Sequence, residues 1–343
     1  MQISPESKKI MISVNPKAGR TSPMLRAEEL RDRLRAMRFD AELASDLSEV
    51  TEKTNRYFRD GDLRVLVGVG GDGTAAELVN RTEQGLPVTL LSAGTANLIA
   101  KYFKLGRTPK RLAEQIAVGN LLQIDAGRVS PISDNPQNDS QTQGSERLFL
   151  VMVGCGLDAE VVQRVHAHRE KRYQSGVKKG GHISYLTYIK PILQTIGSYN
   201  FPEIRVEVLE GGDEMVYRQP HRNVSDMDLS RAYTLANGRW AFVFNLPCYG
   251  WGLPLVPKSV GTDGKLDHCI FDGRSFWHGF KYTAFAQCGS RHRILSDVRL
   301  GQGTKYRLTA DGDVPYQLDG DPGGKLPIEI EIIPQRFTIL APK

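Results

Sequence analysis

Residues 63–80 read LRVLVGVGGDGTAAELVN, and this stretch decides more about the fold than any other part of the chain. The apolar run 63–69 is continuous and rich in β-branched residues, which is typical of a strand buried on both faces of a parallel sheet. It stops at the glycine loop, GGDGT at 70–74, and a helical pattern follows. Glycines let a backbone approach an anion closely, and a helix N-terminus attracts a phosphate. The stretch therefore predicts a strand, a phosphate-binding loop and a helix.

The glycine loop carries a carboxylate, Asp72, which is unusual in a phosphate-binding turn. Asp72 would repel a phosphate unless a divalent cation, a cationic side chain or a transferable proton lay between the two. The loop therefore indicates phosphate chemistry rather than phosphate binding alone.

The glycine loop also fits other interpretations. Gly68, Gly70 and Gly73 satisfy the G-x-G-x-x-G fingerprint of dinucleotide-binding folds, which needs an acidic residue about 20 positions further on to hold the ribose. No Asp or Glu occurs between Glu83 and Glu114, so that interpretation lacks its ribose contact. A Walker-type loop is excluded because the chain has no G-x-x-x-x-G-K-[ST]. A glycine turn that only joins a strand to a helix is the plainest alternative.

The composition is that of a soluble globular protein with room for two domains: 343 residues, 40% hydrophobic and 24% charged. A net charge of +6 is too small to indicate nucleic acid by itself, but it suits an anionic ligand or a membrane surface. The four cysteines show no metal-binding spacing, and no transmembrane run or long apolar signal core is found. We therefore expect a cytoplasmic protein that binds no nucleic acid and contacts a membrane only from outside the bilayer.

Strand-like and helix-like segments alternate in the first third of the chain, which predicts an α/β N-terminal domain with a parallel Rossmann-like sheet. Strand-like runs separated by Gly, Pro or Asp turns then predict a C-terminal antiparallel β-sandwich domain. We place the nucleotide-binding α/β domain at 1–127, with 334–343 returning to it. The β-sandwich substrate domain is placed at 128–333, with a helical insertion at about 158–198. The expected strands of this domain are 147–153, 203–209, 231–236, 240–246, 267–271, 305–309 and 328–333.

Two polar segments interrupt the second domain. Residues 131–146 are almost free of apolar side chains, so we expect a mobile loop. Residues 164–182 hold six Lys or Arg and three His. They are either a solvated helix face and loop, or a basic lip that contacts anionic lipid headgroups.

Several motifs recur in the order in which one family carries them. The first half has N-P-x-x-G-R at 15–20, GGDGT at 70–74 and GTAN at 94–97, and the second half has G-x-G-x-D-A at 154–159 and LDGD at 318–321. The chain thereby resembles the catalytic fold of the diacylglycerol kinase family, which includes sphingosine and ceramide kinases and bacterial lipid kinases. It is more distantly similar to NAD kinase. The resemblance covers nearly the whole chain.

The resemblance implies an ATP- and Mg²⁺-dependent kinase that transfers the γ-phosphoryl group of ATP to a hydroxyl of a lipid, such as a diacylglycerol or a sphingoid base. It implies a protein peripheral to the inner membrane face, and a homodimer is left open. A structural Mg²⁺ site is implied at Asp263 with the backbone carbonyls of Val260 and Lys265, and oxygen-only ligation suits that ion. Carried over by position, the residues that surround ATP are Asn15, Pro16, Lys17, Ala18, Gly19, Arg20, Ser45, Gly70, Gly71, Asp72, Gly73, Thr74, Ala75, Ala76 and Thr95.

Four acids are the candidate catalytic residues. Phosphoryl transfer needs a carboxylate to take the proton of the attacking hydroxyl, and Asp321 occupies the family's proton-acceptor position. Asp319 is a rival for the base, and Asp72 and Asp125 are expected in the network around Mg²⁺ and the nucleotide. A plain β-turn is the alternative for 319–324, whose composition is turn-like.

The chain departs from the family's pattern at several positions. Asp321 stands where the family usually has Glu, so its carboxylate reaches less far, and the usual pair of Asp residues before Gly264 is here Thr262-Asp263. Two alternative functions follow. One is a kinase of a soluble substrate such as NAD, although no paired Asn-Glu/Asp motif that would hold the nicotinamide ribose follows the loop. The other is a non-catalytic homologue that binds a nucleotide or a lipid.

Overall fold

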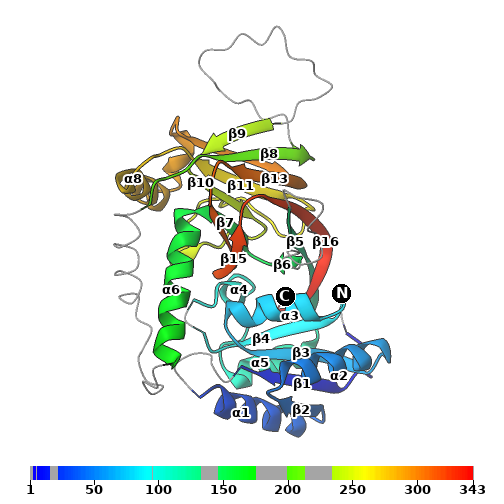
Figure 1. Cartoon of the computed structure of the whole chain (residues 1–343). Coiled ribbons are helices and arrows are strands. Elements are labelled where there is room, and N and C mark those ends of the chain that lie inside the picture. The colour runs from blue at the N-terminus through cyan, green and yellow to red at the C-terminus, as the bar shows by residue number, and fades with distance from the viewer. Residues whose placement is uncertain are drawn as a thin grey trace, which may run out of the picture. The chain divides into compact units, whose positions relative to one another are not determined.

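The computed structural model describes residues 3–4, 6–15, 22–94, 96–132, 146–174, 199–212 and 234–342 (Figure 1). Among these residues, those up to Ala126 and those from Ile333 onward form one compact unit, unit 1, and those from Gly127 to Ile332 form unit 2. Most of the expected loop at 131–146 lies outside the described residues, as does the expected helical insertion beyond Gln174.

Unit 1 is an α/β fold with a parallel sheet, which confirms the predicted class. Its strand order is β2-β1-β3-β4-β16, and each neighbouring pair runs parallel. The strands are β1 (Lys9–Val14), β2 (Asp40–Ala44), β3 (Leu63–Gly70), β4 (Pro87–Ser92) and the second half of β16 (Ile328–Leu340). The helices are α1 (Pro23–Ala36), α2 (Leu47–Arg59), α3 (Asp72–Arg81), α4 (Leu98–Tyr102) and α5 (Pro109–Val118).

The predicted central strand, β3, is buried along its whole length. A strand that is covered on both faces has no polar side to alternate with, which explains the unbroken apolar run in the sequence. Arg64 is the buried exception, and its guanidinium donates to the carbonyls of Ile116 (2.8 Å) and Ala117 (2.7 Å) near the end of α5. A cation suits the negative end of a helix dipole, so the buried charge is compensated.

Unit 2 consists of two antiparallel sheets. One has the order β12-β11-β10-β7-β14-β15, and the other joins the first half of β16 to β13, β8 and β9, with β5 and β6 beside it. Both sheets contribute to one core cluster, with Val153 and Val243 from the first and Val206 and Leu308 from the second, which confirms the predicted β-sandwich. The strands are β5 (Leu121–Pro131), β6 (Arg147–Phe149), β7 (Met152–Gly156), β8 (Ile204–Glu210), β9 (Thr234–Gly238), β10 (Trp240–Phe244), β11 (Leu266–Phe271), β12 (Val298–Gly303), β13 (Lys305–Ala310), β14 (Pro315–Leu318) and β15 (Asp321–Lys325).

Four short or medium helical segments complete unit 2. They are α6 (Leu157–Gln174), α8 (Phe276–Gln287) and the 3₁₀ helices η3 (Gly250–Gly252) and η4 (Arg291–Ile294). The sequence did not predict α8, because its residues FWHGFKYTAFAQ are apolar around most of the circumference and form no single stripe. Within the described residues, no helix has both the length and the apolar character needed to cross a membrane.

The prediction of one strand at 147–153 is wrong, because the structure has two strands there: β6 ends at Phe149 and β7 begins at Met152. The backbone N–H groups of Leu150, Val151 and Met152 donate instead to the carboxylate of Asp319, at 2.8, 2.9 and 2.9 Å. The side chain of Asp319, which is distant in the sequence, therefore interrupts the strand.

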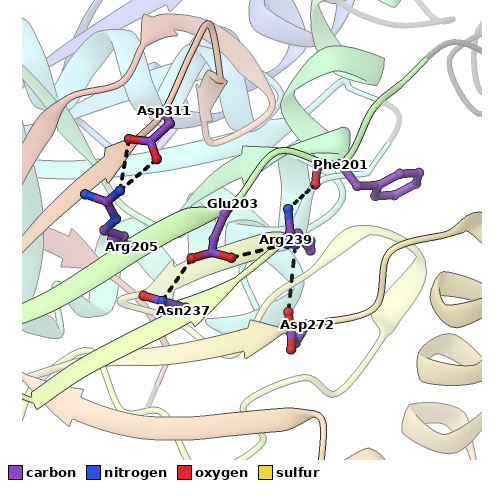
Figure 2. Close-up of polar contacts among 7 residues, drawn as sticks. All are labelled: Phe201, Glu203, Arg205, Asn237, Arg239, Asp272 and Asp311. Atoms are coloured by element: carbon purple, nitrogen blue, oxygen red, sulfur yellow. Dashed lines mark hydrogen bonds and ion pairs between the residues drawn. The ribbon is translucent and has the colours of Figure 1, made fainter.

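A cluster of polar contacts fastens the strand ends of unit 2 (Figure 2). Arg239, between β9 and β10, donates to the carbonyl of Phe201 (2.8 Å) and to Glu203 (3.2 Å). Asn237 donates to the second oxygen of Glu203 at 3.0 Å, and the guanidinium of Arg239 lies 3.9 Å from Asp272, just after β11. The cluster thus connects the segment before β8 to the ends of β9 and β11.

Candidate functional site

The carboxyl ends of β1, β3 and β4 meet at one edge of the parallel sheet of unit 1. Asn15 follows β1, and it donates from its backbone to the carbonyl of Val69 (3.2 Å) and from Nδ2 to the hydroxyl of Thr74 (3.4 Å). Ala93, after β4, donates to the carbonyl of Gly70 at 2.8 Å. Ligands of open parallel sheets bind at this edge, so it is the candidate nucleotide site of unit 1.

Close contacts explain the glycines at this edge. A Cβ on Gly70 would lie 2.0 Å from the hydroxyl oxygen of Thr74, and a Cβ on Gly94 would lie 2.7 Å from the Cα of Gly71. The side chain of Asn97 holds Gly94 by accepting from its N–H (3.1 Å) and donating to its carbonyl (2.8 Å). The two loops after β3 and β4 therefore pack backbone against backbone, and only glycine fits at their contact.

Asp72 begins α3, and its Oδ1 accepts the backbone N–H of Ile99 at 3.0 Å. Ile99 lies in the first turn of α4, where backbone N–H groups lack partners within the helix. Within the part of the chain that the structure describes, no donor reaches Oδ2 of Asp72. One carboxylate oxygen is thus fixed, and the other can bind a cation placed between it and a phosphate.

Other members of the predicted ATP set occupy varied positions. Ser45 is exposed and directly follows β2, while Ala75 and Ala76 are buried in α3. Six members lie outside the described residues: Pro16, Lys17, Ala18, Gly19, Arg20 and Thr95.

Asp125 is buried on β5, and its Oδ1 accepts the backbone N–H of Gln335 at 2.8 Å. Gln335 has a left-handed backbone with φ 53°, so this hydrogen bond stabilises a bend in β16. Asp125 therefore has a structural contact that the sequence did not indicate.

A separate hollow of about 770 Å³ lies on unit 1, with Lys101, Lys104, Arg107 and Arg111 among its lining residues. None of the predicted ATP-site residues lines it, so this hollow is distinct from the glycine loop.

In unit 2, the LDGD motif forms the turn between β14 and β15. Asp319 and Gly320 both have left-handed backbones, with φ of 51° and 92°. Both carboxylate oxygens of Asp319 accept backbone N–H groups of residues 150–152, so Asp319 anchors the turn to the start of β7. Asp321 begins β15 and is half-buried. Asp319 therefore anchors the turn through its hydrogen bonds, and Asp321 is the second acid of the same turn.

A chain of buried hydrogen bonds ends at this turn. Gln317 accepts the N–H of Gly320 on Oε1 (2.7 Å) and donates from Nε2 to Oδ2 of Asp158 (2.9 Å). The hydroxyl of Tyr249 donates to Oδ1 of Asp158 at 2.5 Å. A Cβ on Gly154 would lie 2.5 Å from Oδ2 of Asp158, so glycine at this position makes room for the network.

Burial raises the pKa of Asp158, against the hydrogen bonds from Tyr249 and Gln317, which lower it. Burial also raises the pKa of Tyr249 well above its usual value, and the neighbouring Asp158 adds to the shift. Asp158 is the Asp of the G-x-G-x-D-A motif at 154–159, so the sequence did point to this residue. Nothing in the sequence indicated Gln317 or Tyr249 as its partners.

The predicted Mg²⁺ loop precedes β11. The carbonyl of Val260 accepts the N–H of Thr262 at 2.7 Å, and Oδ1 of Asp263 accepts the N–H of Lys265 at 3.1 Å. Oδ2 of Asp267 is buried and receives no hydrogen bond from the described residues. Burial raises the pKa of Asp267, and the nearby charge of Asp263 raises it further. Mg²⁺ prefers carboxylate and carbonyl oxygens, and Asp267 places a second carboxylate near Asp263.

A parallel α/β unit with an acid in its glycine loop, followed by an antiparallel β-sandwich, is the architecture of a class of two-domain kinases. Residues 9–129 match the family model described as the diacylglycerol kinase catalytic domain. Residues 151–341 match the model described as the YegS C-terminal NAD kinase beta sandwich-like domain. The second match alone spans more than half of the chain, and the chain therefore belongs to the diacylglycerol kinase-like family that these two domains define.

Relatives agree with this membership. A Staphylococcus aureus (strain MSSA476) protein named "putative lipid kinase" is 26% identical over 297 residues, which cover 84% of this chain and 80% of the relative. A protein of the same name from Staphylococcus haemolyticus (strain JCSC1435) is 24% identical, covering 88% and 83%. The crystal structure of a "putative diacylglycerol kinase" from Bacillus anthracis str. Sterne has a TM-score of 0.65 at 17% identity, covering 99% of this chain and 97% of that one. At this identity the structural similarity shows the fold alone.

Proposed function

We propose that the protein is an ATP- and Mg²⁺-dependent lipid kinase, which transfers the γ-phosphoryl group of ATP to the hydroxyl of a diacylglycerol or sphingoid lipid. The observation that carries this proposal is the glycine loop, where Gly71 packs against Gly94 and Asp72 keeps one oxygen available. Relatives named "putative lipid kinase" support a lipid as the acceptor.

In unit 1, the backbone N–H groups at the start of α3 bind the phosphates of ATP, because a helix N-terminus carries unpaired donors and partial positive charge. Asp72, held by Ile99, faces the same ligand and orients a bound cation. Mg²⁺, when bound, offsets the charge of the triphosphate.

In unit 2, Asp321 accepts the proton of the lipid hydroxyl as the hydroxyl oxygen attacks the γ-phosphorus and the bond to ADP breaks. Asp319 and Gln317 do not take part in proton transfer. They position Asp321. Asp319 holds the turn against residues 150–152, and Gln317 accepts the N–H of Gly320.

The direct test is transfer of labelled γ-phosphate from ATP to a total lipid extract. Wild type should label a lipid, and Asp72→Asn and Asp321→Asn should each lose most of this transfer. Asp313→Asn is the matched control, because Asp313 is an exposed acid of unit 2 that pairs with Lys325. Equal transfer by wild type and both site variants would contradict the proposal.

A soluble acceptor such as NAD is the second candidate, since the matched β-sandwich model is described as NAD kinase-like. Phosphorylation of NAD without any lipid product would favour this alternative. Tight ATP binding with no turnover on lipid or NAD would instead indicate a non-catalytic homologue.

A further inference from the structure

Three large apolar residues on adjoining helical segments of unit 2 are each more than 60% exposed. Trp277 and Phe280 lie on α8, the helix labelled in Figure 1. Ile294 ends η4, which packs beside α8. Their side chains are 75%, 63% and 79% exposed. Trp277 and Phe280 are three residues apart, so they lie on one face of the helix. Clustered exposure of this kind marks an interaction site rather than ordinary surface.

The opposite side of these helices is firmly packed. Tyr282 is buried, stacks on Phe271 with ring centres 4.5 Å apart, and donates its hydroxyl to Asp297 at 2.7 Å. In η4, buried His292 donates from Nε2 to the carbonyl of Leu255 at 2.9 Å. The exposed side chains are therefore presented by fixed backbone.

The segment that leads into α8, and α8 itself, are also held by contacts with Trp240 of the sheet. Trp240 donates from its indole nitrogen to the carbonyl of Gly273 at 2.9 Å, and a Cβ on Gly279 would lie 2.5 Å from its ring. Asp272, one residue before Gly273, joins the Arg239 cluster of Figure 2. The helix thus rests on the sheet at Gly279, while Trp277 and Phe280 of the same helix are exposed.

The exposed charged side chains on these segments are cationic. Residues 273–296 contain no Asp or Glu, but they contain Arg274, Lys281, Arg291 and Arg293. Lys281 pairs with Asp297 at 2.7 Å. The three arginines are exposed, and none has an ion-pair partner within the part of the chain that the structure describes. The α8–η4 surface, defined as Trp277, Phe280 and Ile294 with these three arginines, therefore combines exposed apolar and cationic side chains.

We propose that the α8–η4 surface docks the protein onto an anionic lipid bilayer. Tryptophan and phenylalanine partition into the interfacial region of a membrane, and arginines beside them bind anionic headgroups. A second copy of the chain fits this surface poorly, because a two-fold contact would bring arginines together without acids to pair with them. The inference does not require kinase activity, so it stands or falls separately from the proposed function.

The test is co-sedimentation of the purified full chain, without ATP, with phosphatidylcholine vesicles that contain or lack phosphatidylserine. Wild type should bind the anionic vesicles at least about tenfold more tightly than the neutral ones, since each basic residue near such a surface adds about 1 kcal/mol. The W277A/F280A and R291Q/R293Q variants should each lose about tenfold or more of this affinity. Leu25→Ala is the matched control, because Leu25 is 67% exposed on α1 of unit 1 and should leave binding unchanged.

Thermal unfolding of each variant checks that the fold is kept, and the fluorescence of Trp277, compared with a W277F variant, reports its insertion. A blue shift on anionic vesicles that W277F lacks would support docking. Wild-type binding by both double variants would overturn the proposal, and so would equal binding of wild type to neutral and anionic vesicles. A wild-type dimer that W277A/F280A converts to monomer, without vesicle binding, would assign the surface to self-association and overturn it too.

Discussion

Single residues of the candidate site differ in how firmly the backbone holds them. Asp319 accepts three backbone N–H groups and Asp72 accepts one. A carboxylate that satisfies three donors is committed to structure, whereas a base needs an oxygen that can take a proton. Asp319 is such a structural carboxylate and Asp321 is the proposed base, so the two are expected to respond differently to the same substitution.

Asp321→Asn should lower kcat with a lipid acceptor by about 10²–10⁴-fold, the usual contribution of a general base, and should lower the melting temperature less than Asp319→Asn does. Asp319→Asn should instead destabilise unit 2 by about 1–3 kcal/mol, because an amide cannot accept all three N–H groups. Steady-state kinetics and thermal unfolding measure both. Loss of stability in the Asp321 variant with none in the Asp319 variant would reverse the two roles.

Gln317→Met removes the hydrogen bonds that this buried side chain makes with Asp158, Met152 and Gly320, while it keeps the side-chain volume. We expect kcat to fall and KM for ATP to stay constant, because Gln317 positions the turn of Asp321 and unit 1 binds the nucleotide. Gln287→Met, at an exposed position of α8, is the control. A variant that changes only KM for ATP would show that Gln317 does not act through this turn.

At the scale of elements, the sequence predicted the strands and helices whose formation depends on residues adjacent in the chain. The β3 run, the glycine loop and α3 follow from residues adjacent in sequence, and the structure has them where they were expected. The break between β6 and β7 depends on Asp319, which lies 167 positions after Met152, and no local pattern contains that contact. The bond from Gln317 to Asp158 spans 159 positions and was missed for the same reason.

His268 on β11 gives a pH-dependent prediction for the β-sandwich. Burial lowers its pKa to about 4, and its Nδ1 donates to the hydroxyl of Tyr306 at 3.3 Å, since that hydroxyl donates to Leu266. An imidazole with a lowered folded pKa stabilises the fold above pH 6.5, and this stability is lost as the pH falls toward 4. The loss at pH 4 is about 3 kcal/mol. Denaturant unfolding from pH 7.5 to 4.5 should show this slope, and His268→Leu should flatten it; an unchanged slope would refute the assignment.

The loop before β11 predicts a stabilising effect of Mg²⁺. An ion that binds only the folded protein adds about 2.7 kcal/mol at a hundredfold excess over its Kd. The melting temperature of wild type should therefore rise with Mg²⁺, and Asp263→Asn or Asp267→Asn should suppress the rise. Asp311→Asn, an exposed acid paired with Arg205, should behave as wild type. An equal rise in all four proteins would place the ion elsewhere.

At the scale of the whole molecule, the chain divides its chemistry between two units that share strands. β5 and β16 each begin in one unit and end in the other, so the last residues complete the parallel sheet through the pairing of Thr338 with Pro87. The sequence predicted the class of both units from their contrasting periodicities. The identity of the acceptor depends on side chains brought together over long separations in the sequence, and sequence spacing does not encode it.

The most direct measurement for the whole account is mass spectrometry of the lipids formed when the protein is incubated with ATP, Mg²⁺ and a total lipid extract, with NAD present in the same mixture. We predict a lipid species heavier by one phosphate group that appears with wild type, disappears with Asp321→Asn and is unaffected by Asp313→Asn. NADP as the product, with every lipid mass unchanged, would contradict the assignment of a lipid kinase.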